Sequence, residues 1–331
     1  MLNRCDLSKI KIRLSNINQK ITRYVSFFPT EVDTKFQEFK MSSTITCLEN
    51  FGSSYALNPK CSDLIDSWSI YAYDESVQNY KALEGDLLFC SNSVIKMEDK
   101  YRFNLTVLPY FITLMEKYKG LKEDGIYFTE NIAEERNVIL AKSKMDALMN
   151  CVEPKSIVLI DGPLIAGNVS AYMVNLDKKL REMDCIPLYF VKNSDSRLVI
   201  ESDPKLSREF NSDFHWSACG LKPACRTPFF KYVDKHNSHY TKVFTYMKAL
   251  NGFTERIEMH TDTFQKYYEL IMPLMNLMCY FYTAQGDYMN PQVRPIAVAE
   301  KYAREGLKLL NIPVLMGKLG FRPTINQIRF G

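Results

Sequence analysis

The sequence lacks several features that would place it in familiar functional classes. Its 331 residues contain no run of eighteen apolar residues, so we predict no membrane-spanning helix. The richest apolar run, Leu270–Tyr282, is short and contains Pro273, which favours a core helix. The N-terminus has no continuous apolar segment of the kind found in signal peptides. No GxxxxGKS or GxxxxGKT motif occurs, which excludes ATP hydrolysis at a P-loop.

Regular cysteine spacing is also lacking. The nine cysteines are scattered and odd in number, which does not suit a disulfide framework, so we predict a reducing, cytoplasmic location. His215, Cys219 and Cys225 lie close together, but the segment HWSACGLKPAC has no paired CxxC pattern. A zinc site in this segment is therefore the less favoured interpretation.

The chain has no block of like charge. Its formal net charge of +4 is spread along the sequence, which permits a nucleic-acid partner without indicating one. A hydrophobic content of 46% and a charged content of 24% are typical of globular proteins. We expect one large domain, or a domain with an appendage.

The most informative segment is SIVLIDGPL, at Ser156–Leu164. An unbroken apolar run bounded by turn residues predicts a strand buried on both faces. Asp161 stands where this strand ends, and Gly162-Pro163 turn the chain. An acid at such a position can reach a site at the sheet edge. Alternatively, Asp161 begins a turn or caps the next helix.

The order of predicted elements indicates a mixed sheet. Residues 1–60 have apolar residues at helical spacing, which predicts a helical N-terminal segment and a candidate dimer contact. Residues 61–331 form the main domain, with an irregular insertion near 195–240. We predict strands at Ser67–Tyr73, Leu87–Ile95, Tyr101–Leu108, within Ser156–Leu164, and at Cys185–Lys192, Lys242–Lys248 and Arg256–Met259. We predict helices at Asn131–Asn150, Ser170–Met183, Thr263–Tyr282 and Val298–Leu310, and a short helix or loop at Pro109–Tyr118. This order matches a ribonuclease-H-like α/β fold, a mixed sheet flanked by helices.

Acids near strand ends suggest a metal site. Asp74 and Asp161 follow two predicted strands, the helix between them offers Glu134 and Glu135, and Lys192 ends the next strand. Carboxylates from different elements can converge on Mg²⁺ or Mn²⁺, and two such cations can promote phosphodiester cleavage. Lys192 could bind the phosphate or offset its developing charge. Alternatively, both glutamates lie on a solvated helix face and Lys192 extends into solvent.

These segments resemble the NurA nuclease family in sequence and order. The resemblance spans roughly residues 67–310, and IVLIDGPL at 157–164 and YFVKNS at 189–194 are its most specific parts. The other segments are Asp74-Glu75-Ser76, Glu134-Glu135-Arg136, RIEM at 256–259, and Asn290-Pro291 followed by Ala299-Glu300-Lys301-Tyr302-Ala303.

The resemblance implies a ribonuclease-H-like, Mn²⁺- or Mg²⁺-dependent nuclease acting on single-stranded DNA and duplex ends. It implies 5′–3′ exonuclease and single-strand endonuclease activity, a homodimer, and a HerA-type hexameric ATPase as partner in processing DNA ends. By position, Asp74 and Asp161 become catalytic metal ligands and Lys192 a catalytic residue. Glu134 or Glu135 adds a ligand; adjacent helical residues point about 100° apart, so only one can face the site, and we favour Glu135.

The sequence departs from the family pattern at two positions. The family commonly has Asp-Gly-Ser where this chain has Asp74-Glu75-Ser76, so Glu75 changes the loop geometry or adds a ligand. The family often has His or Asp where this chain has Glu300, which can bind a metal through oxygen but cannot replace an imidazole. The chain is interpreted as a divergent member, and an inactive scaffold subunit that docks a translocase ring is the alternative.

Aromatic and basic residues interleave between Phe229 and Tyr246. Lys231, Lys235 and Lys242 lie among phenylalanines and tyrosines, which suits stacking on single-stranded bases with phosphate contacts. Alternatively, this segment is a pair of strands with a basic exposed face. An RNA substrate is also compatible with the predicted fold.

Overall fold

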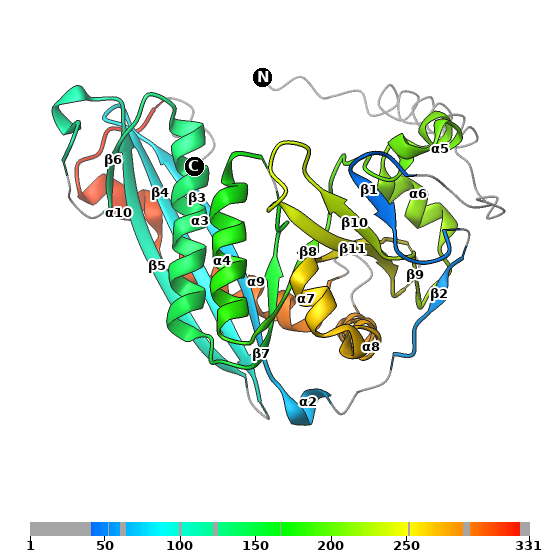
Figure 1. Ribbon diagram of the computed structural model, residues 1–331. Helices are drawn as coiled ribbons and strands as arrows, with labels where there is room; N and C mark the ends of the chain where they lie inside the picture. Colours follow the sequence, from blue (N-terminus) through cyan, green and yellow to red (C-terminus); the bar gives the residue numbers. More distant parts are fainter. Residues whose placement is uncertain are drawn as a thin grey trace, which may run out of the picture.

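The part of the chain that the structure describes forms a mixed sheet of twelve strands with helices on both faces (Figure 1). The computed structural model describes residues 41–324, apart from positions 52, 60–63, 99–100, 122–124, 166, 251 and 287–291. In order across the sheet, the strands are β1 (Ile45–Cys47), β10 (Phe230–Val233), β11 (Thr241–Lys248), β12 (Glu255–His260), β8 (Ile186–Val191), β7 (Ser156–Asp161), β3 (Ser69–Lys81), β4 (Asp86–Met97), β5 (Arg102–Thr113) and β6 (Ile126–Phe128). Two short strands, β9 (Cys225–Arg226) and β2 (Tyr55–Ala56), extend the sheet beside β11. The predicted mixed sheet flanked by helices is confirmed.

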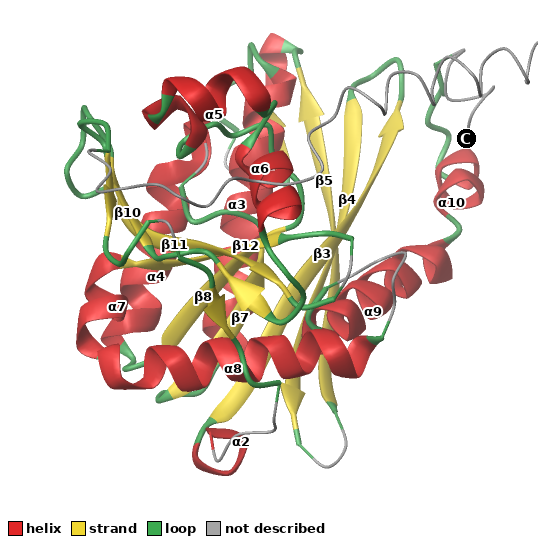
Figure 2. Cartoon of the chain, turned by 90° about the vertical axis from the view of Figure 1, so that its right-hand side faces the viewer, coloured by secondary structure: helices red, strands yellow, loops and turns green. Residues whose placement is uncertain are grey.

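Two helix pairs cover the centre of the sheet. On one face lie α3 (Ile132–Cys151) and α4 (Ser170–Glu182), which pack on Tyr73, Ile160 and Tyr189 (Figure 1). On the other face lie α8 (Tyr268–Gln285) and α9 (Arg294–Leu310), which cross in front of β7, β8 and β3 in Figure 2. Strands β7, β8 and the first part of β3 are parallel and buried on both faces, which explains their apolar sequences.

Strand β3 is longer than the strand predicted at Ser67–Tyr73. β3 continues to Lys81 because its residues pair with β4 as far as Lys81↔Asp86, so Asp74 lies within the strand rather than after it. β5 likewise continues to Thr113, with Pro109 paired to Phe89. The predicted short helix or loop at Pro109–Tyr118 is thus strand as far as Thr113 and ends in a 3₁₀ turn at Glu116–Tyr118.

The segment 195–240 is more regular than predicted. It contains α5 (Pro204–Glu209), α6 (Asp213–Gly220) and the strands β9 and β10. A separate apolar cluster holds it against the sheet, with Phe51 stacked on Trp216 and both packed on Phe230. The predicted strand pair around Phe229–Tyr246 is β10 with β11.

The apolar stripe that predicts an N-terminal helix runs from Ile10 to Val25 and lies outside the described residues, so this helix stays a prediction. The described part of residues 41–60 forms β1 and β2. The helix predicted at Thr263–Tyr282 is two helices, α7 (Thr261–Lys266) and α8, because the backbone leaves helical geometry at Tyr267. Two short helices, α2 (Leu64–Ser67) and α10 (Ile312–Lys318), complete the described fold. No helix within the described ranges is long and apolar enough to cross a membrane.

Candidate active site

Three neighbouring strands present charged side chains on one face of the sheet. Successive residues of a strand point to opposite faces. Ala72 of β3, Leu159 of β7 and Phe190 of β8 pack in the core under α8 and α9. Two residues further along each strand stand Asp74, Asp161 and Lys192, so all three point toward the same face. Register places Asp74 level with Asp161, because Tyr73 pairs with Ile160.

The ammonium of Lys192 lies at the centre of this group. Its Nζ is 3.0 Å from Asp161 Oδ1, 3.8 Å from Asp74 Oδ2 and 4.0 Å from Glu300 Oε2. Glu300 comes from α9, whose Ala299 and Ala303 are buried against the sheet. The structure therefore brings together four of the residues singled out in the sequence, Asp74, Asp161, Lys192 and Glu300. We call these the carboxylate cluster.

Asp74 is the most deeply buried acid of the carboxylate cluster, with 4% of its surface exposed. Its Oδ1 accepts a hydrogen bond from the amide of Glu75 at 2.7 Å, while its Oδ2 accepts none. Burial, with the charge of Asp161 acting in the same direction, raises the pKa of Asp74 to about 8, and the charge of Lys192 opposes the rise. Lys192 therefore does not offset the combined effect of burial and the neighbouring carboxylate on Asp74.

Two further side chains hold the carboxylate of Glu300. Gln292 donates to it from its side-chain amide, and Arg304 forms an ion pair with it from one turn further along α9. The segment Asn290-Pro291, singled out in the sequence, lies outside the described residues. Glu300 therefore reaches the cluster from a rigid helix with its orientation fixed by its neighbours.

Glu75 points to the opposite face of the sheet. Its Oε2 lies 3.3 Å from Lys144 Nζ of α3, and the same ammonium donates to the carbonyl oxygen of Asp161 at 2.9 Å. Lys144 also lies over the ring of Tyr73, 5.2 Å from its centroid. Glu75 therefore does not join the carboxylate cluster, but it anchors a lysine that holds the backbone at Asp161.

Glu134 and Glu135 are not brought to the carboxylate cluster. Both lie in the first turn of α3, where Asn131 caps the helix by accepting from the amide of Glu134. α3 covers the face opposite to the side chains of Asp74 and Asp161, and its first turn is about 14 Å along the axis from Lys144. Sequence order could not reveal which face of the sheet this helix covers.

The turn after Asp161 is held by a buried charged network. Glu258 of β12 accepts hydrogen bonds from the amide of Leu164 at 3.0 Å, from Lys242 Nζ at 2.6 Å and from Arg256 Nε at 2.7 Å. Arg256 also donates to Ser196 Oγ at 2.6 Å, in the segment that follows Lys192. The RIEM segment thus links the two loops that leave the carboxylate cluster. Lys242, proposed from sequence to contact phosphates, is buried here.

One acid near the carboxylate cluster was missed in the sequence. Glu255 begins β12, the strand next to β8, and it is 4% exposed. Burial raises its pKa well above the ordinary range, Lys192 opposes the rise and Asp161 adds to it. Its position depends on the pairing of β12 with β8, which is distant in sequence. The only local signal was an acid two residues before the apolar Ile257.

The carboxylates of Asp74, Asp161 and Glu300 are suitable ligands for a hard divalent cation, and Lys192 lies among them. Within the described part of the chain, no three Asp, Glu, His or Cys side chains lie in a ready metal-binding arrangement. Lys192 Nζ stands among the acids of the carboxylate cluster, within 4.0 Å of each. The donors are carboxylate oxygens, which Mg²⁺ and Mn²⁺ prefer, and Asp74 Oδ2 is buried without a hydrogen bond.

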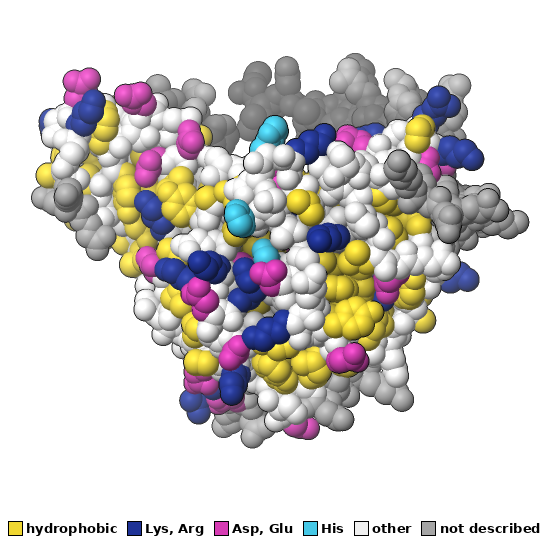
Figure 3. All heavy atoms as spheres, in the orientation of Figure 1, with side chains coloured by type: hydrophobic (Ala, Val, Ile, Leu, Met, Phe, Trp, Pro, Cys, Tyr) yellow, Lys and Arg dark blue, Asp and Glu magenta, His cyan; other side chains and the backbone are white. Residues whose placement is uncertain are grey.

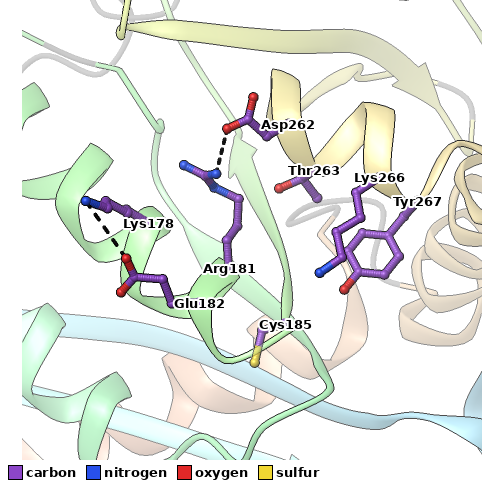
Figure 4. Close-up of a pocket in the computed structure, with 8 residues that line it drawn as sticks. All are labelled: Lys178, Arg181, Glu182, Cys185, Asp262, Thr263, Lys266 and Tyr267. Carbon is purple, nitrogen blue, oxygen red and sulfur yellow. Dashed lines mark hydrogen bonds and ion pairs between the residues drawn. The ribbon is translucent and has the colours of Figure 1, made fainter.

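A separate cavity of about 260 Å³ lies away from the carboxylate cluster (Figure 4). It lies between α4 and α7 and includes Cys185, which precedes β8, whereas Lys192 follows that strand. Its Arg181 pairs with Asp262, and its Lys178 with Glu182. Figure 3 shows basic and acidic side chains interspersed on this side of the molecule. The cavity therefore offers no concentrated charge for a nucleic acid.

Comparison with known proteins identifies the fold. No protein-family model and no curated protein matches the sequence. The NurA nuclease from Sulfolobus solfataricus superposes with a TM-score of 0.57 at 12% identity, over 95% of this chain and 99% of that one.

Two other solved structures are less similar. A structure of NurA with manganese gives a TM-score of 0.40 at 8% identity, over 78% of this chain and 92% of that one. The structure of endonuclease V from Bacillus subtilis gives a TM-score of 0.38 at 8% identity, over 78% of this chain and 86% of that one. Scores this low do not by themselves establish a common fold. On the basis of the Sulfolobus structure, this chain has the fold of the NurA nuclease, in a widely diverged sequence.

Proposed function

We propose that this protein is a metal-dependent nuclease that hydrolyses DNA phosphodiester bonds. The observation that carries the proposal is the convergence of Asp74, Asp161 and Glu300 on Lys192, in a chain with the NurA fold. Three carboxylates and one lysine, brought together from adjacent elements, suit the stabilisation of charge on a transferred phosphoryl group.

In this proposal, Asp74, Asp161 and Glu300 hold Mn²⁺ or Mg²⁺. When bound, such cations activate water and stabilise the leaving oxygen of the phosphodiester. Lys192 is charged, since Asp161 and Asp74 hold its pKa up against the lowering effect of burial. The ammonium of Lys192 would then be available to bind a phosphate oxygen of the DNA backbone. Glu134 and Glu135 have no part in this site because α3 lies on the other face.

The remaining parts of the proposal concern substrate and partners. The resemblance of the sequence segments to the NurA family supports single-stranded DNA and duplex ends as substrates, with 5′–3′ exonuclease and single-strand endonuclease activity. The same resemblance supports a homodimer and a HerA-type hexameric ATPase as partner in DNA end processing. We place the protein in the cytoplasm, where such a partner would act on DNA.

The test is cleavage of labelled single-stranded and duplex DNA with Mn²⁺, with Mg²⁺ and with EDTA. The wild type should degrade DNA only with a divalent cation, and Asp161→Asn should abolish cleavage while remaining folded by circular dichroism. Asp146→Asn, on the exposed side of α3, is the matched control and should retain activity. Full activity of Asp161→Asn would overturn the assignment, and a parallel RNA substrate tests the specificity for DNA.

A second candidate function is a non-catalytic subunit that docks a translocase ring. The observation that favours it is Lys192, whose ammonium already lies among the three carboxylates. In that case no DNA is degraded with Mn²⁺, even in the presence of the partner ATPase. Cleavage by the purified chain alone would eliminate this candidate.

A further inference from the structure

Glu255 lies beside the carboxylate cluster and points toward the same face. β12 pairs with β8 through Arg256↔Val191, so the next position of the ladder places Glu255 beside Lys192. Ile257, two residues further along β12, packs in the core under α8 and α9. Because strand side chains alternate, Glu255 shares this face. Four adjacent strands, β3, β7, β8 and β12, thus carry one row of charged residues.

The carboxylate of Glu255 has no partner among the described residues. The residue is 4% exposed, and neither Oε1 nor Oε2 takes part in a hydrogen bond. Glu258, three residues along the same strand but on the opposite face, is equally buried and accepts three hydrogen bonds. A buried carboxylate without partners is strongly unfavourable. The environment of Glu255 therefore lacks a group that would compensate its charge.

The charged neighbours of Glu255 do not compensate the charge of its carboxylate. Lys192 and Asp161 are the charged groups that shift the pKa of Glu255, and they do so in opposite directions. Lys192 is within 4.0 Å of three other acids and does not reach Glu255 within that distance. Glu255 is thus a fourth carboxyl group beside a lysine that already contacts three others. Such a set suits a doubly charged cation with oxygen ligands better than a further hydrogen bond.

We propose that Glu255 is a fourth carboxylate ligand of the site and binds a divalent cation together with Asp161. The assignment of Glu255 as a metal ligand does not require nuclease activity. Only the statement that this cation serves DNA cleavage rests on the proposed function. It adds a ligand from β12, on the side of the site opposite to Asp74. The site then extends across four neighbouring strands, β3, β7, β8 and β12.

The experiment compares Mn²⁺ binding to the full-length wild type, Glu255→Gln and Asp161→Asn. Free Mn²⁺ is measured by electron paramagnetic resonance during titration, without DNA. Glu255→Gln preserves the shape of the side chain and removes the charge, so it should lose a bound Mn²⁺ or bind it at least about tenfold more weakly. Glu255→Asp, which keeps the charge on a shorter side chain, should bind with intermediate affinity. Glu305→Gln, exposed on α9, is the matched control and should bind as the wild type does.

Stability supplies a second measurement. Without metal, Glu255→Gln should melt at a higher temperature than the wild type, because the amide is neutral, whereas folding of the wild type must either bury the carboxylate charge or take up a proton. With saturating Mn²⁺, the rise in melting temperature should be smaller for Glu255→Gln than for the wild type. If Glu255→Gln fails to fold, Glu255→Asp decides the question through its Mn²⁺ affinity.

Two outcomes would overturn the inference. The first is that Glu255→Gln binds Mn²⁺ with the stoichiometry and affinity of the wild type; if Glu255→Gln does not fold, the same result for Glu255→Asp counts instead. The second is that the wild type binds no Mn²⁺. The nuclease proposal fails separately, if the wild type binds Mn²⁺ and degrades no DNA. In that case a loss of binding in Glu255→Gln still supports the ligand assignment.

Discussion

Lys192 Nζ lies 3.0 Å from Asp161 Oδ1, and this pair connects the ends of two adjacent parallel strands. The same ammonium lies within 4.0 Å of Asp74 and Glu300. Without a metal, Lys192 is therefore the cation that limits repulsion among these acids. A divalent cation and Lys192 compete for the same oxygens, so metal binding should free the lysine for a phosphate.

Lys192→Met tests this competition. The metal-free variant should lose about 2 kcal/mol of unfolding free energy, less than the ~3–5 kcal/mol of a fully buried pair, because Lys192 is partly exposed. Mn²⁺ should stabilise the variant more than the wild type, since no ammonium competes for the acids. Urea unfolding with and without Mn²⁺ measures both effects. Lys301→Met, exposed on α9, is the control. An equal loss of unfolding free energy in Lys301→Met would contradict the prediction, as would equal stabilisation of Lys192→Met and the wild type by Mn²⁺.

Asp177 predicts a pH dependence of stability away from the site. Burial raises its pKa from 3.8 to about 6, although Arg181, at 2.7 Å, opposes the rise. The folded state therefore holds this proton more tightly than the unfolded state, and unfolding free energy falls as pH rises from about 4 to 6.

Asp177→Asn is neutral at every pH and should remove this slope. Relative to the wild type, the variant should gain about 3 kcal/mol of unfolding free energy between pH 3 and pH 7. Urea titrations at unit pH intervals provide the measurement. Asp146→Asn, whose side chain is exposed, is the control for general charge effects. Parallel pH profiles for Asp177→Asn and the wild type would disprove the assignment.

Glu258 should matter for both stability and the position of the loop after Asp161. Glu258→Ala leaves Lys242 and Arg256 buried without their shared acceptor, so it should cost about 3–5 kcal/mol. Glu258→Gln keeps an acceptor for the amide of Leu164 and should cost less. Urea unfolding measures both variants.

The same variants separate positioning from substrate binding. Glu258→Gln should lower kcat for Mn²⁺-dependent cleavage while leaving KM for DNA nearly unchanged, because Glu258 holds a loop and does not face the carboxylate cluster. Glu153→Gln, which pairs with Lys96 at the surface, is the control. A change in KM alone would argue against a positioning role.

Local sequence was sufficient for the residues on the central strands. The apolar runs before Asp161 and Lys192 predicted buried parallel strands, and consecutive parallel strands bring their carboxyl ends to one edge. Asp74 was identified from the same reasoning, although β3 continues beyond it. The polar residues Asp74-Glu75-Ser76 suggested the end of a strand, but pairing with β4 extends β3 through them.

Long-range packing determined what sequence could not predict. Glu134 and Glu135 were placed by order along the chain, but only the tertiary structure shows that α3 covers the other face. Glu255 and Lys144 were missed for the same reason. The role of each depends on a neighbour far away in sequence, Lys192 for Glu255 and Glu75 for Lys144.

Gly306 allows α9 to lie close to β4, and this contact positions Glu300. A Cβ at Gly306 would lie 2.6 Å from Ser91 Oγ and 3.2 Å from a methyl group of Leu105. Gly306→Ala should therefore cost about 1–3 kcal/mol from overpacking, partly offset by the ~1 kcal/mol higher helix propensity of alanine. The shift of α9 should also weaken Mn²⁺ binding through Glu300. Urea unfolding and Mn²⁺ titration measure the two effects.

Ser91→Ala provides the matched rescue. Ser91 Oγ is buried and makes no hydrogen bond among the described residues, so its removal alone should change stability little. Combined with Gly306→Ala, it removes the closest contact, and the double variant should regain the stability and Mn²⁺ affinity of the wild type. Additive losses in the double variant would show that the two residues do not interact. Recovered stability without recovered Mn²⁺ affinity would show that α9 packing does not position Glu300.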